Sequence, residues 1–278
     1  MIWHFRDRSL TFGPRPLVMG IVNVTPDSFS DGGQFFSTEA AIAHGLRLVA
    51  EGADILDVGG ESSRPGSHAV ALAEELARVV PVVRELAARA GVPISVDTTK
   101  AEVARQSLAA GAAIVNDITA LLGDAAMADV VRASGAGVAL MHMQGTPETM
   151  QQNPTYGDVV AEVREFLAGR VAALIEAGIA RERIVLDPGI GFGKTFDHNL
   201  ALLRHLDALT PLGRPVLLGV SRKGFLGQIT GKPRHDRVAS AVAIACHCAT
   251  LGTAHIFRVH DVAPTVDAAK IVAALAGR

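Results

Sequence analysis

The strongest constraint on the fold is a series of eight short β-rich segments that alternate with helical segments. Each β-rich segment is apolar and is bounded by turn residues. Strands that are apolar on both faces and alternate with helices favour a parallel sheet covered by helices. The predicted strands are residues 17–25, 54–60, 93–98, 114–119, 137–143, 184–190, 215–221 and 254–260. Helical periodicity is clear at 38–51, 70–90, 157–178 and 261–276.

Eight β/α units in 278 residues favour a closed (β/α)8 barrel over an open doubly wound sheet. We therefore expect one α/β domain over residues 1–278, a TIM barrel. Residues 3–12 are expected to form a short N-terminal hairpin that plugs the bottom of the barrel. Gly-Ala or Gly-Val pairs precede several strands, which is typical of helix ends. These pairs begin at Gly52, Gly91, Gly111 and Gly137.

Composition and charge exclude several classes of protein. The formal charge of −2 provides no field that would attract nucleic acid or an anionic membrane. No apolar run approaches the ~20 residues that a membrane-spanning helix needs, and residues 1–13 lack the apolar core of a signal peptide. Cys246 and Cys248 lie two positions apart in a predicted helix, where they do not face each other. We expect a reduced cytoplasmic protein.

Polar residues are concentrated at the C-terminal ends of the predicted strands. In a barrel these ends meet on one face, where active sites are built. One Asp at a strand end could equally cap the next helix, but capping does not explain the same bias on all eight strands. The residues are Asn23, Asp57 with Glu61, Asp97, Asn116 with Asp117, His142, Asp187, Ser221 with Lys223, and Arg258 with His260.

Two of these strand ends have the residues of an anion site. Ser63 and Arg64, in the segment VGGESSRPG, supply donors suited to a phosphate, although an ordinary Gly-Pro turn would have a similar sequence. Arg258 and His260 lie at i and i+2 on the last strand and point to the same side. With Asn23 on the first strand, these two side chains could bind a di-anion. Alternatively, His260 is a core histidine and Arg258 a surface arginine.

Other strand ends have the residues of a heterocycle site. A carboxylate beside a carboxamide, here Asp97 and Asn116, can bind the N–H groups and acceptors of a planar ring. Asp187 could add a second carboxylate, and Lys223 could bind ring acceptors, while Gly219 leaves room for a flat ligand. Alternatively, the two carboxylates and the carboxamide are buried polar residues that order the core, and Lys223 is a solvated loop lysine.

Two further segments bear on the site. DPGIGFGKT, residues 187–195, resembles a phosphate-binding loop, but Pro188 stands where that motif requires glycine. Its glycines are better explained by a rigid loop that offers Phe192 as a packing surface. The segment Met19–Gly33 runs from a strand into a loop of small, polar and acidic residues around Phe29, as in the lids of barrel enzymes. Together the residues predict a site for a polar heterocycle that carries a phosphate-type leaving group.

In its motifs the chain resembles the dihydropteroate synthase family of folate biosynthesis. The resemblance covers about residue 17 to the C-terminus. The blocks that carry it are, in order, GIVNVTPDSFSDGG, DVGGESSRPG, SVDT, VNDIT, MHMQGTP, LDPGIGFGK, GVSRKGF and RVHDV. Related pterin-binding methyltransferases share looser forms of several blocks, but the long first loop and the final RVH favour the synthases.

The resemblance implies a transferase that joins para-aminobenzoate to 6-hydroxymethyl-7,8-dihydropterin diphosphate, giving dihydropteroate and pyrophosphate. The implied roles follow matching positions. The pterin would be held by Asp97, Asn116, Asp187 and Lys223, with Met141, Phe192 and Gly219 near it. The diphosphate would be held by Ser63, Arg64, Arg258, His260 and Asn23, with Asn23 also near a bound Mg²⁺. The aminobenzoate pocket would consist of Phe29, Ser63, Pro65, Ser221 and Lys223.

Within this scheme Asp97, Lys223 and Arg258 are the candidate catalytic residues, and Asp27 or Asp31 would take the amine proton. Ser63 stands where the family usually has Thr, and Gly224 where Ser is common. Neither change removes a group that the chemistry needs. The resemblance also implies a homodimer with small-molecule substrates and no nucleic-acid or membrane partner. The alternatives are a pterin-dependent methyltransferase, which would need a corrinoid partner, and a non-catalytic pterin-binding paralogue.

Overall fold

The structure is a computed structural model that describes residues 1–25 and 38–276. Eight parallel strands form one sheet in the order β8-β7-β6-β5-β4-β3-β10-β9. A parallel bridge between Leu186 and Val216 links the two edges of the sheet and closes it into a barrel. The strands are β3 (Leu17–Asn23), β4 (Ile55–Gly59), β5 (Ile94–Asp97), β6 (Ile114–Asp117), β7 (Gly137–Met141), β8 (Ile184–Asp187), β9 (Leu217–Leu218) and β10 (Ile256–Val259). The predicted (β/α)8 barrel is confirmed.

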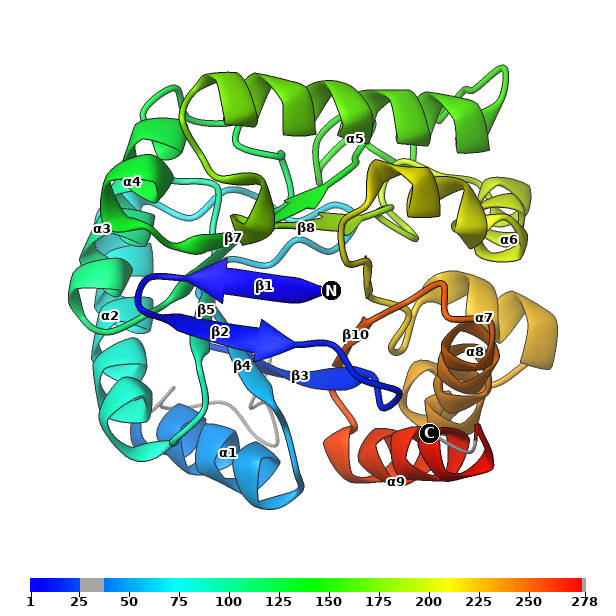
Figure 1. Cartoon of the computed structure of the whole chain (residues 1–278), viewed down its shortest axis with the longest axis horizontal. Helices are drawn as coiled ribbons and strands as arrows, with labels where there is room; N and C mark the ends of the chain where they lie inside the picture. Colours follow the sequence, from blue (N-terminus) through cyan, green and yellow to red (C-terminus); the bar gives the residue numbers. More distant parts are fainter. Residues whose placement is uncertain (26–37, 277–278) are drawn as a thin grey trace.

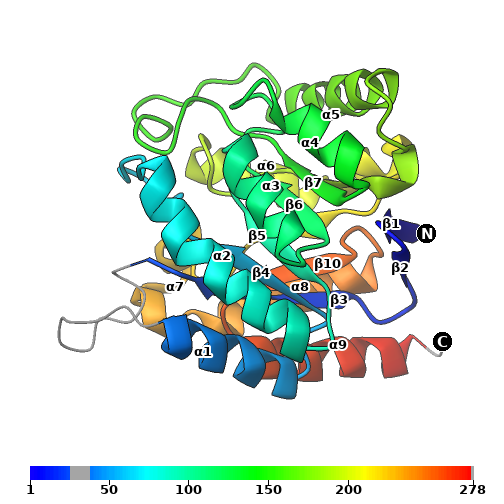
Figure 2. The same cartoon turned by 90° about the vertical axis from the view of Figure 1, so that its left-hand side faces the viewer.

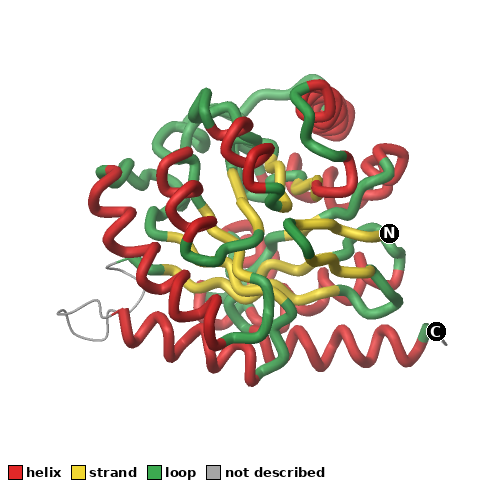
Figure 3. The backbone as a smooth tube through the Cα atoms, turned by 60° about the vertical axis from the view of Figure 1, so that its left-hand side comes forward, coloured by secondary structure: helices red, strands yellow, loops and turns green. Residues whose placement is uncertain are grey.

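The helices form a ring around these strands (Figure 1), with the strands inside and the helices outside (Figure 3). They are α1 (Thr38–Ala50), α2 (Leu72–Arg89), α3 (Ala101–Ala109), α4 (Met127–Ser134), α5 (Val159–Glu176), α6 (Phe196–Arg204), α7 (Gly224–Thr230), α8 (Val238–Thr250) and α9 (Val262–Leu275). Short 3-10 turns lie at η2 (Arg181–Arg183), η3 (Leu206–Leu212) and η4 (Arg234–Asp236). The large apolar cluster between the outer faces of the strands and the helices explains why the strands are apolar on both faces.

Helix boundaries follow local signals in the sequence. The Asp158 side chain accepts hydrogen bonds from the N–H groups of Val160 and Ala161 and so caps the start of α5. At the other ends, three of the four predicted glycines follow helices with a left-handed φ, at Gly52, Gly91 and Gly111. The prediction for Gly137 is wrong, because Gly137 is the first residue of β7 and α4 ends instead at Gly135, with φ 68°.

The N-terminal hairpin closes one end of the barrel. It consists of β1 (Ile2–Phe5) and β2 (Arg8–Thr11), an antiparallel pair. Trp3 and Phe5 are buried against the residues that begin the strands, among them Leu17, Ile114 and Ile256. The hairpin crosses the barrel in Figure 1 and lies at the right-hand end in Figure 2. The predicted plug is therefore confirmed, and the opposite end, where the strands finish, is left to form a site.

Among the helices of residues 1–25 and 38–276, none is long and apolar enough to cross a bilayer.

Candidate functional site

A cavity of about 740 Å³ lies at the C-terminal ends of the strands. The structure brings the predicted site residues of the described chain together around it. These are Asn23, Ser63, Arg64, Pro65, Asp97, Asn116, Met141, Asp187, Phe192, Gly219, Ser221, Lys223, Arg258 and His260. Asp27, Phe29 and Asp31 lie outside the described residues. Parallel strand ends thus converge as the sequence pattern predicted.

The register of the strands aligns one row of polar side chains across the floor. Asn23 pairs with Gly59, Gly59 with Asp97, and Asp97 with Asn116. Further round the barrel, Met141 pairs with Asp187. The carboxylate and the carboxamide predicted to bind a heterocycle are therefore direct neighbours on adjacent strands.

Arg258 is held between two carboxylates. Its Nε lies 2.6 Å from Asp57 Oδ2, and its Nη2 lies 2.5 Å from Asp97 Oδ2. The amide of Asn116 donates to the same Asp57 oxygen at 3.0 Å. Because Asp57 is fully buried beneath the cavity, it fixes both side chains from below. Only three of the five N–H donors of a guanidinium remain for a ligand after these two contacts.

Burial and the neighbouring charges act in opposite directions on the pKa values of Asp97 and Arg258. Burial raises the pKa of Asp97 to about 7, and the nearby Arg258 opposes the shift. For Arg258, burial lowers the pKa, but Asp57 and Asp97 outweigh burial and raise it above its ordinary value. The guanidinium therefore stays charged, while Asp97 is poised to gain or lose a proton near neutral pH.

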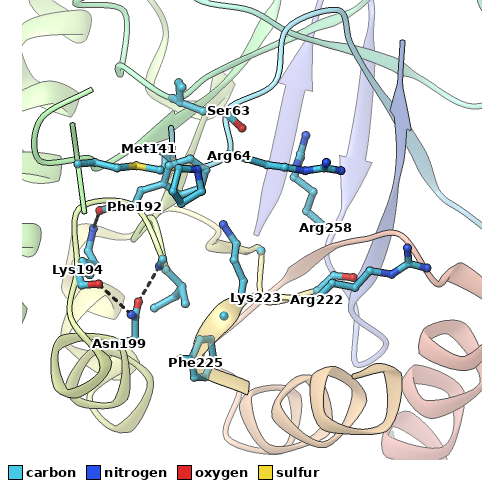
Figure 4. Close-up of a pocket in the computed structure, with 18 of the residues that line it drawn as sticks. Ser63, Arg64, Met141, Phe192, Lys194, Asn199, Arg222, Lys223, Phe225 and Arg258 are labelled. Atoms are coloured by element: carbon cyan, nitrogen blue, oxygen red, sulfur yellow. Dashed lines mark hydrogen bonds between the residues drawn. The ribbon is translucent and has the colours of Figure 1, made fainter. Parts of the chain in front are cut away.

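The opposite wall carries a lysine over an aromatic ring. Lys223 Nζ lies 3.9 Å from the centroid of the Phe192 ring, and Figure 4 shows Lys223 projecting between Phe192 and Arg258. Burial lowers the pKa of Lys223 to about 8, although Asp187 opposes the shift. Burial also raises the pKa of Asp187, whose Oδ1 accepts the Gly189 N–H at 2.7 Å. A Cβ added at Gly219 would meet no protein atom within 4 Å, so this glycine leaves open space.

Ser221 and His260 form a hydrogen-bonded pair at the cavity. The backbone N–H of His260 donates to Ser221 Oγ at 3.2 Å, and the same oxygen lies 3.0 Å from His260 Nδ1. The Ser221 hydroxyl oxygen has two acceptor lone pairs and one proton, so it bonds Nδ1 in either neutral tautomer of the ring. Burial and four neighbouring arginines hold the pKa of His260 well below its usual range. His260 is therefore a neutral imidazole at the cavity.

Arginines that the sequence analysis did not select add positive charge to the cavity. Arg222, Arg234 and Arg237 also line it. Arg222, with a left-handed φ of 59°, is anchored by two hydrogen bonds to Asp261, at 3.1 and 2.6 Å. In Figure 4, Arg64, Arg222 and Arg258 lie on one side and Phe192 with Lys194 on the other. The site thus has a cationic side and a side suited to a ring.

His142 and Lys194 have structural roles. Lys194 Nζ lies 3.0 Å from His142 Nδ1 and donates to the carbonyls of His142 and Phe192, at 3.2 and 2.9 Å. His142 is buried and makes an edge contact with Phe166. The lysine of the loop that resembles a phosphate site thus ties that loop to the end of β7.

No group of three or more His, Cys, Asp or Glu side chains in the described chain could hold a metal ion. Asn23 offers one amide oxygen at the cavity. Mg²⁺ commonly binds through one or two protein oxygens together with phosphate oxygens and water. Among the described residues the donor set therefore fits a divalent cation only where ligands from outside the chain complete its coordination.

The family model of the pterin binding enzymes matches residues 19–260. A dihydropteroate synthase from Neisseria meningitidis serogroup B is 50% identical over 267 residues, which cover 94% of this chain and 93% of that protein. The chain belongs to the dihydropteroate synthase family. The resemblance seen in the motifs is thereby confirmed.

Solved structures of the dihydropteroate synthase family share the whole fold. The Xanthomonas albilineans dihydropteroate synthase with 4-aminobenzoic acid is 50% identical, with a TM-score of 0.90 and coverage of 98% of this chain and 96% of that one. The Burkholderia cenocepacia dihydropteroate synthase complexed with 7,8-dihydropteroate is 48% identical, with a TM-score of 0.89 and coverage of 99% and 96%.

Proposed function

We propose that this chain condenses para-aminobenzoate with 6-hydroxymethyl-7,8-dihydropterin diphosphate to give 7,8-dihydropteroate and pyrophosphate. The observation that carries the proposal is that one cavity has both a carboxylate–amide row on its floor and arginines along one side. Such a cavity matches a substrate with a polar ring at one end and a diphosphate at the other. Relatives solved with 4-aminobenzoic acid and with 7,8-dihydropteroate support the same reaction.

In this proposal the pterin lies on the floor. Asp97 and Asn116 bind its N–H groups and acceptors, and Asp187 adds a second carboxylate. Lys223 binds ring acceptors from above, and Gly219 leaves the space that a flat ring requires. Met141 and Phe192 supply apolar surface beside the ring.

The diphosphate lies on the cationic side. Ser63, Arg64 and the remaining N–H donors of Arg258 bind its oxygens, together with the imidazole of His260 and the amide of Asn23. Mg²⁺, bound through Asn23 and the phosphate oxygens, would neutralise part of the negative charge. Ser63, Pro65, Ser221 and Phe29 are proposed for the aminobenzoate pocket, with Phe29 outside the described residues.

At the pterin methylene carbon the reaction breaks one bond and forms one, and the amine also gives up one proton. The aminobenzoate nitrogen bonds to the pterin methylene carbon, the C–O bond to the diphosphate breaks, and pyrophosphate leaves with the electron pair. The largest barrier is charge on the leaving group, which preorganised cations such as Arg64 and Arg258 stabilise. Positive charge on the pterin methylene is spread over the ring and stabilised by Asp97. Asp27 and Asp31 remain the candidate acceptors of the amine proton.

We extend the proposal to the protein as a whole: residues 1–278 form one pterin-binding domain, which pairs as a homodimer in the cytoplasm. Ile271 and Leu275, one turn apart on α9, are 62% and 83% exposed, which supports a contact with a second copy. Both cysteines, Cys246 and Cys248, are free, which agrees with a reducing compartment.

Pyrophosphate release is the direct test. Wild-type protein with the pterin diphosphate, para-aminobenzoate and Mg²⁺ should release pyrophosphate, while Asp97→Ala and Arg258→Ala lose most of this activity. Arg105→Ala, on the exposed face of α3, is the matched control, and circular dichroism checks that each variant is folded. Absence of release by wild type, with corrinoid-dependent methyl transfer in its place, would establish the methyltransferase alternative. Pterin binding without either reaction would indicate the non-catalytic paralogue.

A further inference from the structure

A charged cluster lies behind the cavity, between the end of β5 and the segment that joins β4 to α2. We call it the Lys100 cluster, and it consists of Lys100, Glu75, Glu61 and Thr98. Among these four, Glu61 lines the cavity and the other three do not. The proposed reaction uses none of the four, so their burial and charge need a separate explanation.

Glu75 is the buried member of the cluster. Its side chain, on the first turn of α2, is 1% exposed. Lys100 Nζ lies 2.5 Å from Glu75 Oε2, and the Thr98 hydroxyl donates to Glu75 Oε1 at 2.6 Å. A carboxylate is kept in such a place only when it is paired and hydrogen-bonded. Both partners come from the three residues that follow Asp97, so Glu75 fixes the chain just beyond β5.

Glu61 connects the same lysine to the β4–α2 segment. Lys100 Nζ lies 2.6 Å from Glu61 Oε2, and the same oxygen accepts the N–H of Val70 at 2.7 Å. Glu61 therefore closes residues 61–70 into a loop, and Lys100 holds the base of that loop. Burial lowers the pKa of Lys100, but the two carboxylates outweigh it and raise the pKa, so the lysine stays charged.

The loop that Lys100 holds carries the proposed anion binders. Ser63 and Arg64 lie inside residues 61–70, and the Ser67 hydroxyl contacts the carbonyls of Ser62 and Arg64, at 2.5 and 2.7 Å. Because the loop is braced internally and attached at its base, movement of the base would displace Ser63 and Arg64 together. Pterin-binding residues on β5 and β6 are held by the barrel itself.

We propose that Lys100, paired with Glu75, is a positioning residue that holds the 61–70 loop so that Ser63 and Arg64 face the diphosphate and the aminobenzoate. This inference rests on the proposed function. A general structural role for Lys100 would weaken the binding of every substrate alike, whereas a positioning role predicts a selective loss. Loss of Lys100 weakens the use of the diphosphate and of aminobenzoate, while binding of the pterin ring is unchanged.

The test compares Lys100→Met with Lys100→Arg and with Arg105→Met. Arg105 pairs with Glu102 on the exposed face of α3 and is the matched control. In Lys100→Met, KM for aminobenzoate and for the pterin diphosphate should each rise roughly tenfold, with a smaller change in kcat. The dissociation constant of 6-hydroxymethylpterin without diphosphate, from calorimetry, should equal that of wild type. Lys100→Arg should restore most of the loss because it keeps the charge.

A second variant guards against misfolding, because Lys100→Met leaves Glu75 buried without its cation. The double variant Glu75→Leu/Lys100→Met removes both charges, so it should unfold at a temperature closer to wild type and still show the raised KM values. Wild-type KM values in either variant overturn the inference, as does an equal loss of affinity for hydroxymethylpterin. Absence of turnover in wild type would instead refute the proposed function.

Discussion

Two lysines beside the cavity have different roles although their chemistry is the same. Lys223 projects into the cavity over Phe192, whereas Lys194 is 2% exposed and donates to two carbonyl groups. Burial lowers the pKa of Lys194 to about 7, with Lys223 nearby adding to the shift and Asp187 opposing it. Lys194 therefore contributes to folding and gives it a pH dependence.

The pH dependence of Lys194 has a definite sign. Its pKa is about 7 in the folded chain and 10.5 ordinarily, so between these values the unfolded chain binds more protons. The free energy of unfolding due to this group must then rise with pH over that window. Urea unfolding at about pH 7 and about pH 9.5 should show the difference between wild type and Lys194→Met shifting in favour of wild type. Lys270→Met, on the exposed side of α9, is the control. A constant or falling difference would refute the assignment.

Residues at strand ends were predictable, because parallel strands bring their ends to one face whatever the sequence between them. The row Asn23, Asp97 and Asn116 follows from this rule alone. The pairings were not predictable. Arg258 contacts Asp57 across 201 positions in the sequence and Asp97 across 161 positions, and both contacts reach past the neighbouring strand β3. The sequence pattern places Asp57 at a strand end, but only the structure shows that Asp57 supports Arg258.

Among the elements, the strands show where sequence pattern succeeds and where it fails. All eight were found because turn residues bound each apolar run, but β9 has two residues where 215–221 was predicted. Apolar residues continue past the hydrogen-bonded part of a strand into the helix interface, so composition overstates strand length. Gly137 shows the other limit. Position 137 is glycine because a side chain there would meet the hairpin at Trp3, 134 positions away, and not because a helix ends there.

Gly137→Ala tests this contact between elements. A Cβ at Gly137 would lie 3.0 Å from Trp3 Nε1 and 3.1 Å from Phe5 Cβ. The Trp3 ring cannot easily move because its N–H donates to the carbonyl of Arg183 at 2.9 Å. We expect a loss of about 1–3 kcal/mol in the free energy of unfolding by urea, as for other overpacked cores. Gly169→Ala, inside α5 with no atom within 4 Å, is the control and should gain about 0.5–1 kcal/mol. Equal effects at both glycines would exclude the packing explanation.

In the whole molecule, the stabilising hairpin and the cavity lie at opposite ends of the barrel axis. The hairpin fills the end where the strands begin (Figure 2), and the cavity lies among the residues at the end where they finish. Helices on the outside, including α9, are free to contact another molecule without entering the cavity. Length, hydrophobic content and the β/α alternation predicted this plan, since few other folds accommodate eight such units. They do not specify a partner surface, because sequence does not show which apolar residues stay exposed; the structure leaves Ile271 and Leu275 exposed together on α9.

The proposed homodimer is therefore tested through the outer face of α9. If Ile271 and Leu275 lie in the contact, Ile271→Glu places a charge in an apolar interface and should convert a dimer of twice 29.0 kDa into monomers in sedimentation velocity. Ile175→Glu, at the end of α5, is the matched control, because α5 lies on the opposite side of the barrel from α9 (Figure 1). Specific activity of the monomer should stay close to wild type, because the cavity residues come from the other ends of the strands. A wild-type protein that sediments as a monomer would refute the dimer, and a dimer unaffected by Ile271→Glu would move the contact to another face.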